Sequence, residues 1–174
     1  MYFDSRHKVF TSFYHKDDQS YKDYIDRYFS RIIINKSVAS GEYDPDDKDE
    51  YIKRLIRENK ISDSSVVVVL IGPNTKKRKH VDWEIYAGLR ASIHGNAGLV
   101  GIALPELPID YYGQYYLDDL PARFADNLRS GYAELCKWDY AINNFGTIVQ
   151  RAFDNRIAKR HLIDNSRLQM KRNL

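Results

Sequence analysis

The segment KKRKHVDWE, residues 76–84, gathers side chains that can do chemistry at the expected start of an amphipathic helix. On that helix Glu84 lies three residues after Val81 and four before Gly88, at the edge of the apolar stripe. Its carboxylate has two interpretations. It is either aimed at a bound molecule, or it only favours the helix dipole by about 0.3–1 kcal/mol.

Several familiar reactive sites are missing from the sequence. No G-x-G-x-x-G or P-loop pattern is present to cradle phosphates, and no G-x-S-x-G elbow is present for a nucleophilic serine. The five histidines and the single cysteine, Cys136, have no metal-ligand spacing, so we expect no metal. We expect Cys136 to be a half-buried thiol in a helix. A phosphoacceptor domain would need an aspartate at the end of the buried strand. This chain has IGPN there, which argues against that class of protein.

Length and composition favour one globular domain over residues 1–174, with a core at about 7–160 and a basic tail, 161–174, that frays. The longest apolar run, Val66–Ile71, is far shorter than the ~20 residues of a membrane span. The N-terminal segment lacks a signal-peptide core, which predicts a cytoplasmic protein. A net charge of +3 is too small to indicate nucleic acid as a partner.

Strand and helix patterns alternate along the chain and predict an α/β fold with a central parallel sheet. Helices are expected from about Asp17, through DEYIKRLIRENKI, after the basic run, near 122–128 and over 139–159. The strands are predicted at Lys8–Phe13, Ile32–Ile34, Val66–Ile71 and Leu99–Ala103.

Ligands of such sheets bind where the loops after the strands converge. Three segments are expected to meet there: FYHKDD, the loop after IIIN, and GPNTKKRKHVDWE.

The blocks KVFTSFYHKDDQSYKDYI, INKSVASGEYD, SVVVVLIGPNTKKRKHVDWEIYAGL and GLVGIALP occur in this order. Together they resemble the TIR-like family of bacteria and archaea, which includes the TIR-like subunit of Thoeris anti-phage defence systems. The resemblance covers roughly residues 7–105. It implies a flavodoxin-like, three-layer fold and an enzyme that takes NAD+ as its substrate, with no cofactor. Such enzymes break the nicotinamide–ribose bond and form a cyclic or otherwise modified ADP-ribose signal.

The resemblance also implies a site. The catalytic glutamate of the family maps onto Glu84, which would stabilise the oxocarbenium character of the ribose. Glu84→Gln is then expected to spare folding, losing at most the dipole contribution, and to abolish most turnover. The substrate-binding residues that we predict are Phe13, Tyr14, His15, Ser37, Asn74, Asp82 and Trp83.

The implied partners are NAD+, further copies of the chain, an effector protein that receives the product, and a phage-derived trigger. Two alternatives compete with the enzyme. The same fold serves as a non-catalytic interaction module in some TIR proteins. A nucleic-acid binder using KKRK and the basic tail would show a steep salt dependence of binding.

Overall fold

The computed structural model describes residues 6–37, 50–91 and 95–174, and a five-stranded sheet forms its centre. All strand pairs are parallel. The middle strand is a run of valine, leucine and isoleucine in which every residue is buried, as expected for a strand covered by helices on both faces. In sheet order, the strands are β2 (Ile33–Asn35), β1 (His7–Ser12), β3 (Val66–Ile71), β4 (Gly98–Ala103) and β5 (Glu134–Lys137).

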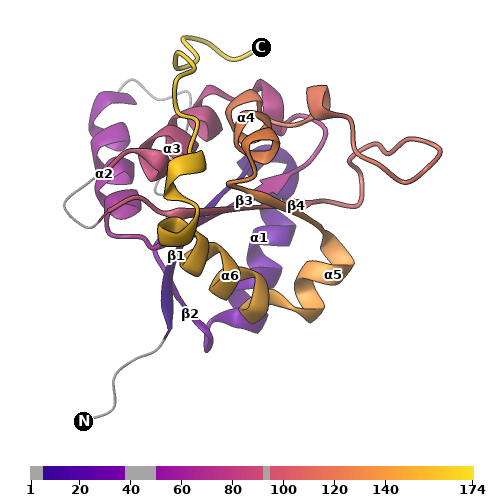
Figure 1. Ribbon diagram of the computed structural model, residues 1–174, viewed down its shortest axis with the longest axis horizontal. Coiled ribbons are helices and arrows are strands. Elements are labelled where there is room, and N and C mark those ends of the chain that lie inside the picture. The colour runs from indigo at the N-terminus through magenta and orange to yellow at the C-terminus, as the bar shows by residue number, and fades with distance from the viewer. Residues whose placement is uncertain (1–5, 38–49, 92–94) are drawn as a thin grey trace.

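Helices cover both faces of this sheet and complete three layers (Figure 1). They are α1 (His15–Phe29), α2 (Glu50–Ser62), α3 (Lys79–Leu89), α4 (Ala122–Ser130), α5 (Trp138–Asn143) and α6 (Phe145–Ala158), with short 3₁₀ helices η1 (Thr75–Lys77), η2 (Leu117–Asp119) and η3 (Arg160–Leu162). Helices α2, α3 and α4 lie on one face, and α1, α5 and α6 lie on the other. Alternate residues of β3 belong to the two apolar cores that result.

The close packing of α6 on β4 depends on one glycine. A Cβ atom at Gly98 would lie 2.0 Å from the carbonyl oxygen of Ala152, so only a residue without a side chain permits this approach.

The architecture confirms the predicted α/β class, and the four predicted strands are present with bounds shifted by at most one residue. The sequence pattern missed β5, a short edge strand with a charged residue at each end, and wrongly placed Cys136 in a helix. The predicted final helix is divided into α5 and α6 at Asn144, whose φ of −137° is not helical. That residues 1–174 form one domain stays a prediction.

The C-terminal segment, residues 163–174, lies along α3, and the prediction that it frays was wrong. Asn165 donates its side-chain amide to the carbonyl of Tyr86, towards the end of α3, at 3.2 Å. At the start of α3, the backbone N–H of Lys79 donates to the Asn173 side chain at 2.9 Å. The segment therefore runs antiparallel to α3 and contacts both ends of it.

Within the described ranges, no helix has the length and apolar character to cross a membrane.

Candidate functional site

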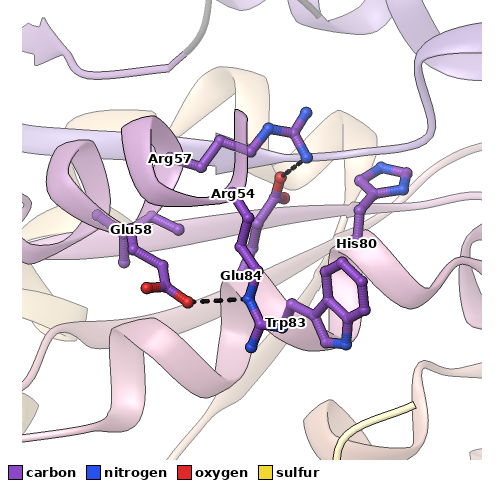
Figure 2. A pocket seen from close by; sticks show the side chains of 7 residues that line it. Arg54, Arg57, Glu58, His80, Trp83 and Glu84 are labelled. Atoms are coloured by element: carbon purple, nitrogen blue, oxygen red, sulfur yellow. Dashed lines mark hydrogen bonds and ion pairs between the residues drawn. The ribbon is translucent and has the colours of Figure 1, made fainter. Parts of the chain in front are cut away.

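Glu84 lies where the carboxyl end of β1 meets the first half of α3. Helix α3 packs Val81 and Ile85 into the core, which aims the intervening Glu84 at the end of β1. Ser12, the last residue of β1, donates its hydroxyl to Glu84 Oε2. From α2, Arg57 Nη1 lies 2.8 Å from Glu84 Oε1 (Figure 2). Two neighbouring elements therefore hold the carboxylate that α3 presents, one at each oxygen.

This carboxylate is deeply buried, because Glu84 is only 4% exposed. Burial raises the pKa of Glu84 above its ordinary value, since a charged group loses its hydration there. The guanidinium of Arg57 and the hydroxyl of Ser12 lower the same pKa, because both interactions favour the charged form. The charge state of Glu84 is thus set by a balance between burial and its neighbours.

Two histidines lie beside this carboxylate. His80 Nε2 donates to the carbonyl oxygen of Phe13 at 3.0 Å, and because a carbonyl only accepts, the proton is on Nε2. The ring of His15 lies 5.9 Å from that of His80 and 4.2 Å from that of Phe13. Burial lowers the pKa of His80 to about 3 and that of His15 to about 4, so both rings are neutral at physiological pH.

A cavity of about 20 Å³ lies between α2 and α3, next to the carboxylate. It has room for about one water molecule. The residues that line it are Arg54, Arg57, Glu58, Ile61, His80, Trp83 and Glu84 (Figure 2). Among the described residues, no group of three or more His, Cys, Asp or Glu is placed to hold a metal ion.

Trp83 forms one wall of the cavity, and the C-terminal segment and two basic side chains contact its indole ring. Its indole N–H donates to the carbonyl of Met170 in the C-terminal segment at 2.8 Å. The Arg54 guanidinium lies 4.5 Å from the ring centroid and the Lys79 ammonium 5.1 Å from it. These cations already contact the indole, so an anionic group of a ligand would meet positive charge at this wall.

The remaining residues predicted from the first and third loops lie apart from the cavity wall. Tyr14 is the N-cap of α1, and the guanidinium of Arg78 lies 4.4 Å from the centre of its ring. Asn74 donates to Asp17 at 2.9 Å and accepts from Lys77 at 3.1 Å. Both residues are near the carboxyl edge of the sheet, but neither lines the cavity beside Glu84.

Ser37 and Asp82 also face elsewhere. Ser37 Oγ accepts the backbone N–H of Thr11 at 2.7 Å and borders a separate hollow of about 370 Å³. Asp82 points to the opposite side of α3, where it accepts from Arg123 Nε at 2.8 Å and from the N–H of Met170 at 2.8 Å. The structure does not bring either residue to the Glu84 cavity, and their role in substrate binding stays a prediction.

The basic run is divided among local partners. Lys76 pairs with Asp119 at 2.7 Å and Lys77 with Asn74 at 3.1 Å. Arg78 lies over Tyr14. The contact of Lys79 with Asn173 also places the end of the basic tail beside this run, so binding of nucleic acid there stays an untested alternative.

The sequence analysis missed the two direct partners of Glu84, Arg57 and Ser12. Arg57 lies four residues before the buried Ile61, so its position on the apolar face of α2 was a readable signal. Ser12 carried no comparable signal, because a serine at the end of a strand is common in any turn.

Residues 10–108, more than half of the chain, match the family described as Thoeris protein ThsB, TIR-like domain. The matched range includes every residue that lines the cavity beside Glu84. No curated protein matches the sequence.

Proposed function

Because the chain belongs to the TIR-like domain family of Thoeris protein ThsB, we propose that it cleaves NAD+ at the nicotinamide–ribose bond in anti-phage defence. The observation that carries this proposal is the Glu84 carboxylate, buried and held at the edge of a cavity by Arg57 and Ser12. The product is a cyclic or otherwise modified ADP-ribose, which an effector protein of the same system receives.

The reaction begins when the bond between the ribose carbon and the nicotinamide nitrogen breaks. Its electron pair leaves with nicotinamide, which becomes a neutral ring, and positive charge develops on the ribose. Glu84 stabilises that charge as a preorganised carboxylate in a site without bulk water. Water then adds to the ribose carbon, or an adenine nitrogen of the same molecule adds and closes a ring. In either case the group that adds releases one proton to the solvent.

The neutral histidines fit this chemistry. The leaving ring needs no proton, so the site needs no strong general acid. His15 and His80 keep their low pKa values because they are buried, and therefore add no positive charge beside a ribose that is itself becoming positive. Their neutrality removes a repulsion that imidazolium rings would create.

The burial of Glu84 is the reason to propose a rearrangement before the substrate enters. Glu84 is 4% exposed, so a ribose reaches its carboxylate when α2 and α3 separate. A phage-derived trigger or assembly with further copies of the chain is the step that we propose to open the site.

The test is release of nicotinamide from NAD+ by the purified protein, alone and with an extract of phage-infected cells. Wild type is expected to release nicotinamide, and Glu84→Gln is expected to lose nearly all of it. Glu58→Gln is the matched control, because Glu58 lines the same cavity but pairs with Arg54 at 3.0 Å. Comparing the product with linear and cyclic ADP-ribose standards identifies it. Equal rates for wild type and Glu84→Gln would refute the proposed role of Glu84.

A second candidate function, a non-catalytic interaction module, is favoured by one surface. The loop between β4 and η2 exposes Tyr111 at 97% and Tyr112 at 83%. Asp110 fixes this loop by accepting the backbone N–H groups of Tyr112 and Gln114, each at 2.8 Å. If the chain acts only as such a module, serine at both tyrosines lowers the mass of the assembly in light scattering, and neither wild type nor variant releases nicotinamide.

A further inference from the structure

Arg57 reaches the cavity from α2, a different element from the helix that carries Glu84. Its guanidinium lies 2.8 Å from Glu84 Oε1, and the two side chains are 6% and 5% exposed. A buried ion pair is expensive to desolvate, so it is weak evidence for a role in stability alone.

We infer that Arg57 is the positioning residue for Glu84: its guanidinium keeps the carboxylate charged and fixes its orientation beside the cavity. The inference rests on the proposed function, because the cleavage needs an ionised carboxylate.

The groups that face Glu84 come from every element packed around it. They are Ser12 at the end of β1, His15 on α1, Arg57 on α2 and His80 on α3. Serine is uncharged, and both histidines are neutral at physiological pH because burial lowers their pKa values. Among these described groups, Arg57 therefore supplies the positive charge that opposes the effect of burial on Glu84.

Arg57 acts on the histidines in the same direction. Its charge is the second cause, after burial, of the low pKa of His80, and it also contributes to that of His15. One guanidinium thus favours the charged form of the acid and the neutral form of both bases. Its removal should raise the pKa of all three groups, while burial continues to lower the pKa of the two histidines.

Arg54 provides a matched control one turn earlier on α2. It lines the same cavity, but its guanidinium bonds Glu58 at 3.0 Å and Gln169 at 3.2 Å rather than Glu84. Substituting Arg54 removes one positive charge from the same wall and leaves the Arg57–Glu84 contact in place.

The experiment is a pH titration of the glutamate side-chain carboxyl carbons by ¹³C NMR, with the Glu84 signal assigned by its absence in Glu84→Gln. In Arg57→Gln, the titration point of Glu84 is expected to rise by about 1–3 pH units, the effect of losing an opposite charge in contact. Arg54→Gln is expected to leave it within about half a unit, and Arg57→Lys, which keeps a charge, is expected to fall in between. If Arg57→Gln does not fold, Arg57→Met fills the same buried space without charge and replaces it.

An unchanged titration point in Arg57→Gln or Arg57→Met would overturn the inference, and so would an equal rise in Arg54→Gln. The readout does not need turnover, so it separates this inference from the proposed function. If the titration point of Glu84 rises in Arg57→Gln but the wild type never releases nicotinamide, the positioning role of Arg57 is supported and NAD+ cleavage is contradicted. Nicotinamide release by the wild type, together with an unchanged titration point of Glu84 in Arg57→Gln, would support NAD+ cleavage and contradict the positioning role of Arg57.

Discussion

Helix α3 carries two buried carboxylates that differ in what surrounds them. Asp82 and Glu84 are each 4% exposed, and each has an arginine nitrogen 2.8 Å from an oxygen. Asp82 faces α4 and the C-terminal segment, where Arg123 and the N–H of Met170 donate to it. Glu84 faces β1, α2 and a cavity.

Burial and an arginine partner are common to both carboxylates, so these two features do not distinguish them. Both carboxylates have a donor at each oxygen, but Asp82 is not among the residues that line the cavity. At Glu84 two neutral histidines and a small open volume lie next to the carboxylate, and burial raises its pKa. We therefore propose a structural role for the first ion pair and the chemistry for the second.

Asp82→Asn is expected to have the largest effect on stability, a loss of about 3–5 kcal/mol in the free energy of unfolding. The substitution leaves the Arg123 guanidinium, which is 0% exposed, without its counter-charge. Urea denaturation measures the loss. The control is Asp126→Asn, whose arginine partners are about half exposed and for which about 0–1 kcal/mol is expected. Equal losses in the two variants would remove the basis for calling the Asp82 pair structural.

Glu84→Gln is expected to lower the rate of nicotinamide release by about 10²–10³-fold, equivalent to about 3–4 kcal/mol of barrier. Its stability loss should exceed the ~0.3–1 kcal/mol that the helix dipole alone predicts, because the carboxylate belongs to a buried ion pair. It should remain below that of Asp82→Asn, because Arg57 borders a cavity with room for about one water molecule, whereas Arg123 is 0% exposed. Melting temperature and turnover are measured on both variants. If Asp82→Asn loses as much turnover per folded molecule, the two carboxylates do not differ as proposed.

Acidic pH is expected to lower the stability of the protein through His80, which lies on the Glu84 side of α3. The pKa of His80, lowered to about 3 in the folded protein, is near 6.5 in the unfolded chain. The unfolded state therefore binds more protons below pH 6.5, and stability falls as the pH decreases towards 3, by about 1.4 kcal/mol at pH 5.5.

Replacing His80 tests this effect. In His80→Gln the loss of stability between pH 7.5 and 5.5 is expected to be about 1 kcal/mol smaller than in wild type. His161→Gln, at an exposed position, is the control and should follow wild type. Parallel pH curves for wild type and His80→Gln would show that His80 is not held neutral beside Glu84.

The fold was largely predictable because its signals are local. The run Val66–Ile71 reads as a strand buried on both faces, and alternation of strands with helices implies a parallel sheet. Strand β5 was missed because an edge strand of four residues with charged ends has no such pattern.

The site was only partly predictable because its contacts are long-range. The position of Glu84 follows from helical periodicity, and the resemblance supplied its role. Its partners Ser12 and Arg57 are distant in sequence and meet it only when β1, α2 and α3 pack together. Asp82 could not be separated from Glu84 in advance, because its partner Arg123 belongs to α4 and its second donor to the C-terminal segment.

The smallest expected effect concerns how the C-terminal segment holds the Asp82 side of α3. The N-cap of α3, Arg78, makes no capping hydrogen bond with its side chain, and Asn173 instead accepts the backbone N–H of Lys79 at 2.9 Å. A capping side chain contributes about 1 kcal/mol, so Asn173→Ala should lower stability by that amount. Arg172→Ala, at a neighbouring exposed position, is the control and should stay within about 0.5 kcal/mol of wild type. Turnover of folded Asn173→Ala should change less than twofold, because Arg57 and Ser12 still hold Glu84 from the other side of the helix. Thermal melting and nicotinamide release are measured together. A large loss of turnover with little loss of stability would show that the C-terminal segment controls the cavity side of α3 too, and that the two sides are coupled.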